Sequence, residues 1–388
     1  MLKSKRVALS EVVCHFRSLE DPRSSINRRH PLIGVVVTSL MAVLSGADGP
    51  TAIHKWAEAK RELLRRALPL PNGIPSKDVF RRVLMALEPA AFQACFVNWL
   101  NAMRSAANSG STASGDAPTL AIDGKTLRGS HDRRNGLGPL HLVSVWMSEA
   151  GLTLGQVATD AKSNEITAIP ELLKLVDVSG AIVTIDAMGT QTAIAEQIIN
   201  NGGDYVLALK GNQSGLHQAV IAHVNDHLND DFARVNVRRH VVSEQKHGRR
   251  EKRSYIQLPV PADLPGRKRW KGLRTIGVVV YESYRGDEET LEVRYFISSL
   301  RLGVKQFARA VRNHWGIETT CHWSLDVTYR EDAQRTRHRR LAENLAWLRR
   351  FTLSLIKQHP GKESLVMKRR MCGWNDDFLM QVLTTTTL

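Results

Sequence analysis

A run of small and polar residues, from 105 to 118, divides this chain into two parts whose hydrophobic residues follow different periods. Before this run, apolar side chains recur with the spacing of amphipathic helices. After it, short runs rich in β-branched residues alternate with turn residues, which is typical of strands. The run itself lacks the apolar side chains that a core needs, so it is expected to be a linker. The pattern predicts a small all-α N-terminal domain (1–105), a linker (106–118), a strand-containing domain (119–358) and a C-terminal tail (359–388).

Two predicted helices of the N-terminal part begin at residues that favour helix starts. Thr51 is the expected N-cap of a helix at 52–68, and Ser76 is the expected N-cap of a helix at 77–87. Three prolines between these helices separate them. The second helix either contacts DNA or packs one face and exposes the other, because it combines apolar side chains with Lys77, Arg81 and Arg82.

The part after the linker has a specific order of elements. The expected elements are strands at 119–123, 140–147 and 152–158, a helix at 167–176, a strand at 181–186, a helix at 190–200 and a strand at 205–209. This is the order of an RNase H-like α/β core, which a second helical block from about Val304 would complete. Four strand-like runs between residues 212 and 303 predict a β-rich insertion within this domain.

Two aspartates are expected at the ends of strands. Asp123 ends the first predicted strand and precedes Gly124, and Asp186 ends the fourth. If these two strands are neighbours, both carboxylates emerge at one edge of the sheet, close enough to share a cation. Like charges at such a distance require neutralisation, which a divalent metal ion supplies. An Asp-Gly pair after a strand is also a common turn sequence, so neither aspartate identifies a site by itself.

Glu318 is the third candidate carboxylate, at the expected start of a helix. Three oxygen ligands suit Mg²⁺ or Mn²⁺ rather than zinc, and two such ions about 4 Å apart catalyse in-line phosphoryl displacement. On a continuous helix, His314 and His322 share the face of Glu318, which leaves a zinc site as an alternative. That alternative does not explain the two strand-end aspartates. Asp326 lies on the same helical face and is the reserve candidate for the third ligand.

The chain is strongly basic. Its 54 Lys and Arg residues against 38 Asp and Glu residues give a formal net charge of +16. This excess favours a polyanionic partner, because Lys and Arg side chains on phosphates release condensed counterions; a basic protein without such a partner is the alternative. The four cysteines form no C-x-x-C pair, and the longest apolar stretch, 32–44, is too short to span a bilayer. With no signal peptide evident, these features predict a cytoplasmic location.

Five sequence blocks carry a resemblance to a known family. They are AIDGKTLRGS (121–130), IDAMGTQ (185–191), LALKGNQ (207–213), HWGIE (314–318) and HWSLDVTYRED (322–332). Through them the chain resembles the ISAs1 family of insertion-sequence transposases, which includes the H-repeat-associated proteins, from about residue 8 to about residue 358. The resemblance implies an RNase H-like catalytic domain, a helical N-terminal associated domain and Mg²⁺-dependent transposition. It implies that Asp123, Asp186 and Glu318 form the catalytic DDE triad.

Basic side chains flank the acidic blocks and are candidates for DNA contacts. The candidates, each of which can instead be solvated surface, are Lys125, Arg128, Lys210, His314, Arg330, Arg335 and Arg337. The basic cluster 246–253 either faces DNA or protects a sheet edge. Trp315 and Trp323 either stack on a base or pack in the core, and core packing is the favoured interpretation. The helix predicted at 341–357 is expected to pack on the sheet and to expose a basic face with Arg339, Arg340, Arg349 and Arg350.

The sequence therefore predicts a DNA transposase that cleaves element ends and transfers strands by two-metal-ion phosphoryl transfer. Mg²⁺ is the expected cofactor, with Mn²⁺ as a substitute. The expected partners are double-stranded DNA, as terminal inverted repeats and target DNA, and a second copy of the chain, because two element ends must be brought together. Two alternatives remain open: a catalytically silent DNA-binding protein derived from a transposase, and an RNase H-like nuclease without strand transfer.

Overall fold

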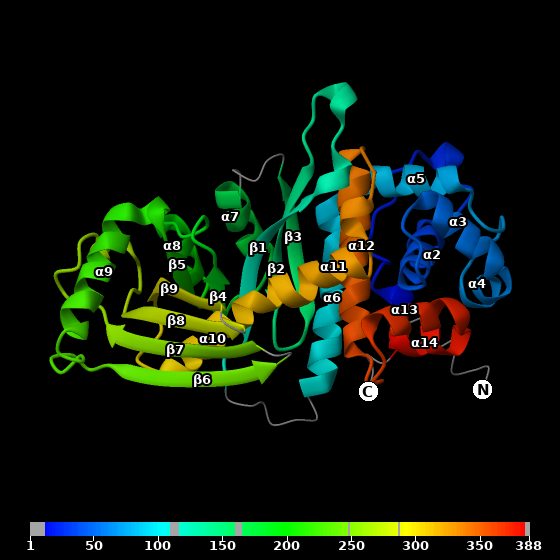
Figure 1. Cartoon of the computed structure of the whole chain (residues 1–388). Helices are drawn as coiled ribbons and strands as arrows, with labels where there is room; N and C mark the ends of the chain where they lie inside the picture. Colours follow the sequence, from blue (N-terminus) through cyan, green and yellow to red (C-terminus); the bar gives the residue numbers. More distant parts are fainter. Residues whose placement is uncertain (1–11, 109–115, 160–164, 247–248, 286–287, 385–388) are drawn as a thin grey trace.

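The computed structural model describes residues 12–108, 116–159, 165–246, 249–285 and 288–384. It has a mixed α/β fold with one nine-stranded sheet and helices around it (Figure 1). The strands are β1 (Thr119–Leu127), β2 (Leu140–Met147), β3 (Leu152–Thr159), β4 (Ile182–Ile185), β5 (Asp204–Leu209), β6 (Arg238–Lys246), β7 (Arg249–Pro259), β8 (Thr275–Arg285) and β9 (Glu288–Ser298). The α-helices are α2 (Leu32–Leu44), α3 (Pro50–Ala59), α4 (Arg61–Ala67), α5 (Lys77–Ala86), α6 (Pro89–Asn108), α7 (Glu165–Leu175), α8 (Thr192–Asn200), α9 (Ser214–Leu228), α10 (Val304–Gly316), α11 (Trp323–Val327), α12 (Arg339–Gln358), α13 (Leu365–Trp374) and α14 (Asp376–Thr384).

The strands follow the order β3-β2-β1-β4-β5-β9-β8-β7-β6 across the sheet. β1 is antiparallel to β2 and parallel to β4, and β4 is parallel to β5. The segment between residues 212 and 303, for which the sequence predicted a β-rich insertion, contributes β6 to β9 and also the helix α9. Its last strand, β9, pairs with β5 in antiparallel orientation. The added strands therefore extend the same sheet instead of forming a separate layer.

The two faces of β1 are covered by different helices. Successive side chains of a strand point to opposite faces of the sheet. On one face, Gly124 lies against Glu165 at the start of α7. On the other face, Lys125 Nζ lies 2.7 Å from Asp326 Oδ1 of α11. Asp123 shares the face of Lys125, so its side chain lies on the side of α10 and α11.

Helix α12 connects helices α2 to α5 to the sheet, and Figure 1 shows it between them, with α6 beside it on the side of the sheet. Its Phe351 ring lies 4.2 Å, centroid to centroid, from the ring of Phe96 on α6. On the sheet side, its Ser354 hydroxyl accepts a 3.1 Å hydrogen bond from the backbone N–H of Thr153 in β3. Helix α2 contacts α3, α5, α12 and α13 and is almost entirely buried, as expected for a helix that is apolar on all sides. The N-terminal helices, α12 and part of the sheet share one hydrophobic core, whereas α10 packs on the sheet through a separate cluster around Phe307.

The prediction that α12 exposes Arg349 and Arg350 is wrong. These side chains are 3% and 0% exposed, and Arg350 Nη1 lies 2.9 Å from Oε1 of the buried Glu331. Arg349 also donates a 3.1 Å hydrogen bond to the backbone carbonyl of Asp48. Arginine is usually a surface residue, but α12 has neighbours on several sides, so both guanidinium groups need internal partners. Arg340, nearer the start of the helix, is exposed as predicted.

Other boundaries also differ from the sequence prediction. The helix predicted at 52–68 is divided at Lys60 into α3 and α4, and Gly49 rather than Thr51 occupies the N-cap position. Ser76 has an extended N-cap backbone but makes no side-chain capping hydrogen bond. Where a tail was expected after residue 358, α13 and α14 form and bury apolar side chains such as Leu379. Among the described residues, no single helix is long and apolar enough to cross a bilayer; α5 and the first part of α6 reach that length only as a pair bent by 94°.

Gly277 of β8 packs against α10, and its replacement should destabilise the fold. A β-carbon at this position would overlap the buried ring of Phe307, which the rings of Tyr255 and Phe296 hold in place. We therefore expect Gly277→Ala to lower the free energy of unfolding by about 1–3 kcal/mol, as overpacking does. Urea unfolding would measure the loss, with Gly211→Ala as the control, because a β-carbon at Gly211 meets no atom within 4 Å. Equal stability of the two variants would contradict this account of the packing.

Candidate active site

Asp123 and Asp186 lie where the parallel pairing of β1 and β4 ends. The last paired residues are Ile122 and Ile185, so each aspartate follows directly after this pair. Asp123 and Asp186 therefore lie at the same edge of the paired region. The prediction that Asp123 ends its strand is wrong: β1 continues to Leu127, because β2 still pairs with it beyond the end of β4.

Glu318 lies in a π-helical segment, η7 (Ile317–His322), which joins α10 to α11. The sequence placed it at a helix start, whereas the helical run begins at Val304 and passes through this residue. Ile317 and Cys321 of the segment are buried, while Glu318 is exposed. The π-helical turn therefore packs its apolar side chains and leaves the carboxylate at the surface. Such turns are rare and occur frequently at functional sites.

The pKa of Asp123 reflects its burial and the carboxyl groups near it. Burial raises the pKa of Asp123 to about 7, and the negative charges of Glu318, Asp186 and Glu165 contribute to the increase. A hydrogen bond from the backbone N–H of Gly124 to the Asp123 carboxylate opposes it. Of the predicted carboxylates, Asp186 and Glu318 line one cavity, and the charges of both reach Asp123. The charge of Glu165, which the sequence did not suggest, reaches Asp123 from the opposite face of β1.

The chemistry of this carboxylate group fits a hard divalent cation. All three predicted side chains offer carboxylate oxygens, which Mg²⁺ and Mn²⁺ prefer. A cation would also offset the burial and the neighbouring negative charges, which raise the pKa of Asp123. Within the described parts of the chain, no three His, Cys, Asp or Glu side chains lie close enough together to hold a metal ion.

Two histidines border the carboxylates in their uncharged form. His314 Nδ1 lies 3.0 Å from Thr184 Oγ1, and burial lowers the pKa of His314 to about 4. His322 Nδ1 lies 3.6 Å from Asp123 Oδ2, and burial with nearby positive charges lowers the pKa of His322 to about 3. At neutral pH neither imidazole therefore supplies a positive charge to the carboxylates. The contact with Thr184 of β4 also engages the Nδ1 nitrogen of His314.

Lys125, a candidate DNA contact, lies inside the protein. Its side chain is 8% exposed, and its Nζ lies 2.7 Å from Asp326 Oδ1 and 3.1 Å from Asp332 Oδ1. Arg128 is exposed, and its Nε lies 3.3 Å from Asp332 Oδ2. Lys125 is therefore an internal ion-pair partner rather than a free cation at the surface. The same network engages Asp326, the reserve candidate for a metal ligand.

The remaining candidate DNA contacts divide into two groups. Lys210, which follows β5, lines a cavity of about 200 Å³ together with His314 and two of the carboxylates, Asp186 and Glu318. The other group consists of exposed arginines on the segment between α11 and α12, namely Arg330, Arg335 and Arg337. The structure therefore brings Lys210 and His314 to the carboxylates, whereas the three arginines lie on a connecting segment.

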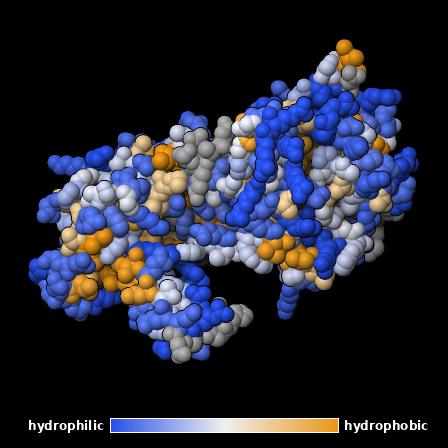
Figure 2. Space-filling view, turned by 45° about the horizontal axis from the view of Figure 1, so that its top comes forward, coloured by the Kyte–Doolittle hydropathy of each residue, from blue (hydrophilic) through white to orange (hydrophobic). Residues whose placement is uncertain are grey.

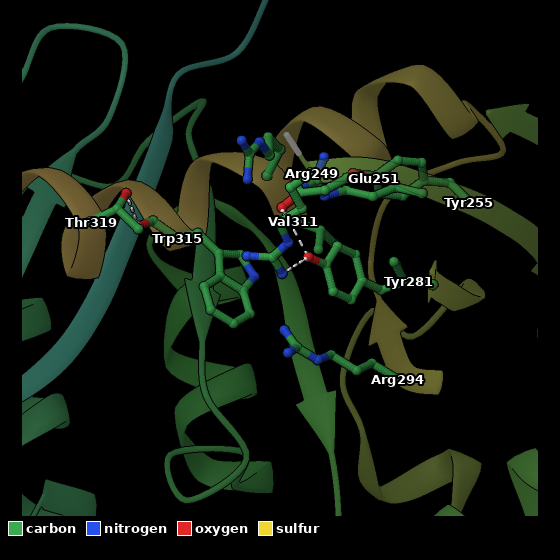
Figure 3. A pocket seen from close by; sticks show the side chains of 11 residues that line it. Arg249, Glu251, Tyr255, Tyr281, Arg294, Val311, Trp315 and Thr319 are labelled. Atoms are coloured by element: carbon green, nitrogen blue, oxygen red, sulfur yellow. Dashed lines mark hydrogen bonds and ion pairs between the residues drawn. The ribbon is translucent and has the colours of Figure 1, made fainter. Parts of the chain in front are cut away.

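A second cavity, of about 340 Å³, adjoins the first and shares the side chains of Arg294 and Trp315 with it. Figure 3 shows arginine and aromatic side chains from the added strands and from α10 around this cavity. The Arg294 guanidinium lies 4.3 Å from the centre of the Trp315 ring, and that of Arg253 lies 5.2 Å from the centre of the Tyr281 ring. Trp315 is half-buried, but Trp323 is 56% exposed, so core packing is wrong for Trp323.

Sequence reasoning missed two further polar residues, which lie on the opposite face of β1 from Asp123. His141 and Glu165 form a buried pair, with His141 Nε2 lying 2.6 Å from Glu165 Oε1. The one signal for this pair is Gly124, for which the local sequence indicates a turn. In the structure Gly124 lies within β1, where the absence of a side chain leaves room for the pair.

Comparison with known proteins matches both parts of the chain. The family model described as the transposase DDE domain matches residues 114–355, and the model described as DDE_Tnp_1-associated matches residues 13–100. Among named relatives are YhhI and YbfD of Escherichia coli K12, both described as an "H repeat-associated putative transposase". YhhI is 36% identical over 393 residues, which cover 98% of this chain and 99% of YhhI. YbfD is 37% identical over 261 residues, which cover 66% of this chain and 97% of YbfD.

A solved structure of a piggyBac transposase synaptic complex with hairpin DNA also aligns with the chain. The alignment covers 98% of this chain and 77% of that one, with a TM-score of 0.38 and 10% sequence identity. A similarity of this size carries no argument about fold or function. The match to the DDE-domain model over more than half of the chain, and the identity to full-length relatives, show the family. The chain belongs to the DDE transposase family.

Proposed function

We propose that this chain is a metal-dependent DNA transposase that cleaves the ends of its element and joins them to target DNA. Asp123, Asp186 and Glu318 are the proposed catalytic residues and the proposed ligands of two Mg²⁺ ions, which Mn²⁺ can replace. The proposal is supported by the position of Asp123 and Asp186 directly after the last paired residues of β1 and β4. It is also supported by the cavity that Asp186 shares with Glu318 and by the pKa of Asp123, which is raised to about 7. Bound ions would activate the attacking water or 3′-hydroxyl and stabilise the leaving oxygen.

The proposal includes an RNase H-like core built from the first five strands. The order β3-β2-β1-β4-β5, with β1 antiparallel to β2 and parallel to β4 and then β5, supports it. In such a core, the two aspartates lie on adjacent parallel strands and the glutamate arrives from a later helix. The positions of Asp123, Asp186 and Glu318 agree with this arrangement.

The residues around the carboxylates suggest how a DNA strand is held. Lys210 is exposed and lines the same cavity as Asp186, so it can contact a phosphate next to the proposed scissile bond. Arg128, Arg330, Arg335 and Arg337 are also exposed and can contact phosphates further along the strand. His314 is uncharged and would act as a hydrogen-bonding group rather than as a cation. Lys125 is left out of this set because its ammonium group is already paired inside the protein.

The helical N-terminal domain is the proposed binding site for the element end. Lys77, Arg81 and Arg82 are exposed on α5, which presents them along one side of the helix. Figure 2 shows that the face turned toward the viewer is predominantly hydrophilic, with separate hydrophobic patches. A homodimer is part of the proposal, because two element ends must meet before their strands are joined. Double-stranded DNA, as terminal repeats and target, is the proposed substrate.

Cleavage of a labelled duplex that carries the element's own ends tests the proposed function. We expect the wild type to cleave and join this duplex with Mg²⁺ or Mn²⁺, and to do neither in EDTA. Asp186→Asn keeps the size of the side chain but removes its charge, so it should bind the duplex as the wild type does without cleaving it. Asp263→Asn, an exposed aspartate elsewhere on the surface, is the matched control and should remain active.

The outcomes of this experiment separate the alternatives. Binding by every variant without cleavage in any divalent ion would contradict the enzyme proposal and favour a DNA-binding remnant. Metal-dependent cleavage without joining of a matched end would favour a nuclease. Cleavage by Asp186→Asn at the wild-type rate would exclude the proposed role of this carboxylate.

A further inference from the structure

His141 of β2 and Glu165 of α7 form a hydrogen-bonded pair behind the candidate site. Their side chains are 2% and 5% exposed, and His141 Nε2 lies 2.6 Å from Glu165 Oε1. The other ring nitrogen, Nδ1, lies 2.9 Å from Thr126 Oγ1 of β1. Both nitrogens of the imidazole are therefore engaged. The three side chains connect β1, β2 and the start of α7 on the face of the sheet opposite to Asp123.

The pair packs directly against the residue that follows Asp123. A β-carbon on Gly124 would overlap both the Glu165 carboxylate and the His141 ring, so the pair requires glycine at this position. Gly124 directly follows Asp123 in β1. The buried pair therefore packs against the backbone immediately next to a proposed metal ligand.

A polar pair is not needed here to fill the core. Ionisable groups lose hydration on burial, and apolar replacements of similar volume are often neutral or stabilising. Every residue of β2 is buried, and His141 stands between Leu140 and Leu142, so an apolar side chain would suit this strand as well. The negative charge of Glu165 also reaches Asp123. The position of the pair is thus better explained by the carboxylate site than by core packing.

We propose that His141 and Glu165 are positioning residues for Asp123. They hold Gly124 and thereby the direction of the Asp123 carboxylate, and Glu165 adds negative charge behind the site. This inference rests on the proposed metal-dependent function, because its consequence is tighter cation binding. In metal sites, groups that orient a ligand typically change the affinity by about 10–100-fold when they are removed.

Mn²⁺ binding to the full-length protein, measured by loss of the free-ion EPR signal, tests the inference without relying on activity. The double variant His141→Leu with Glu165→Leu should bind Mn²⁺ about 10–100-fold more weakly than the wild type. Its melting temperature should equal or exceed that of the wild type, because the buried pair is replaced by apolar groups. Glu165→Gln keeps an acceptor oxygen and the size of the side chain, so it should show a smaller but measurable loss.

A control variant separates this effect from a general loss of buried hydrogen bonds. Gln257 is fully buried and bonds to Thr275 Oγ1 at 3.0 Å and to the backbone N–H of Gly303 at 2.8 Å, outside the carboxylate site. Gln257→Leu removes these bonds and should leave Mn²⁺ affinity unchanged. An equal loss of affinity in this control would overturn the inference, because the effect would not be specific to Asp123.

The remaining outcomes distinguish the inference from the function on which it rests. Wild-type Mn²⁺ affinity in a folded double variant would overturn the inference, whatever its melting temperature. If the double variant does not fold, wild-type affinity in Glu165→Gln overturns it instead. If the wild type binds no more Mn²⁺ than Asp186→Asn does, the proposed metal-dependent function fails, and the failure is not that of the buried pair.

Discussion

Asp123→Asn is expected to abolish DNA cleavage and, in the absence of metal, to make the folded protein more stable. Both effects have the same cause, which is the negative charge of this carboxylate beside Asp186 and Glu318. The proposed reaction needs that charge to hold a cation. Without a cation the same charge is buried and repelled by its neighbours. Asparagine has nearly the same shape and removes the charge.

The raised pKa of Asp123 determines how the free energy of unfolding changes with pH. The pKa of Asp123 is raised from 3.8 to about 7 by folding. The folded protein therefore binds this proton more tightly than the unfolded chain, and the resulting stability is fully present below about pH 4. It decreases as the pH rises through 7, by an amount of the order of 2–4 kcal/mol. Asp123→Asn lacks this titration and should lose less stability over the same pH range.

Urea unfolding in EDTA at a series of pH values between 4 and 8 measures this difference. The wild type and the surface control Asp263→Asn should become less stable over this range by more than Asp123→Asn does. Addition of Mg²⁺ at pH 8 should stabilise the wild type and leave Asp123→Asn nearly unchanged. Parallel pH profiles of wild type and Asp123→Asn would show that the Asp123 carboxylate is not buried against other negative charges.

Arg350→Met is expected to lower the free energy of unfolding by about 3–5 kcal/mol, because it leaves a buried charge without its partner. Arg350 and Glu331 are both 0% exposed, and Arg350 Nη1 lies 2.9 Å from Glu331 Oε1. Removal of the arginine leaves a buried carboxylate with Arg349 as a partner at 3.7 Å. At that distance there is no direct hydrogen bond. The methionine fills the volume, so the loss would come from the charge rather than from a cavity.

The double variant Glu331→Leu with Arg350→Met provides the matched comparison. Both charges of this pair are removed together, and only the buried Arg349 loses its more distant carboxylate partner, so the double variant should lose less stability than Arg350→Met does. Urea unfolding of the wild type, both single variants and the double variant gives the coupling free energy of the pair. A loss below about 1 kcal/mol in Arg350→Met would show that Arg349 alone neutralises Glu331.

The parts of the fold that the sequence predicted correctly are those that local patterns determine. The strand at Leu140–Met147 has the same bounds in prediction and structure, because it is a mostly apolar run between turn residues, interrupted by His141 and Ser144. The side-by-side placement of Asp123 and Asp186 followed from one condition, that their strands are neighbours, and the parallel pairing of β1 with β4 meets it. The catalytic role of these residues stays a prediction.

The parts that the sequence did not predict depend on partners far away in the chain. Lys125 resembles a surface cation in the sequence because its ion-pair partner Asp326 follows 201 residues later. Arg350 fits the exposed face of an amphipathic helix, since nothing in the local period shows that a helix has neighbours on several sides. His141 gives no signal at all, because its partner Glu165 lies in another element. Buried polar pairs are thus decided by tertiary packing, which a local pattern does not contain.

The π-helical segment between α10 and α11 changes the direction in which side chains leave this helical run. In an α-helix each residue is rotated by about 100° from the one before it. A turn closed by i→i+5 bonds accommodates one more residue, so every later side chain is out of phase with the earlier ones. The helical run continues from Val304 to Val327. Its first part, α10, packs on the sheet, whereas its last part, α11, contacts α12. The two ends of one helical run therefore pack against different elements, and Glu318 lies in the π-helical segment between them.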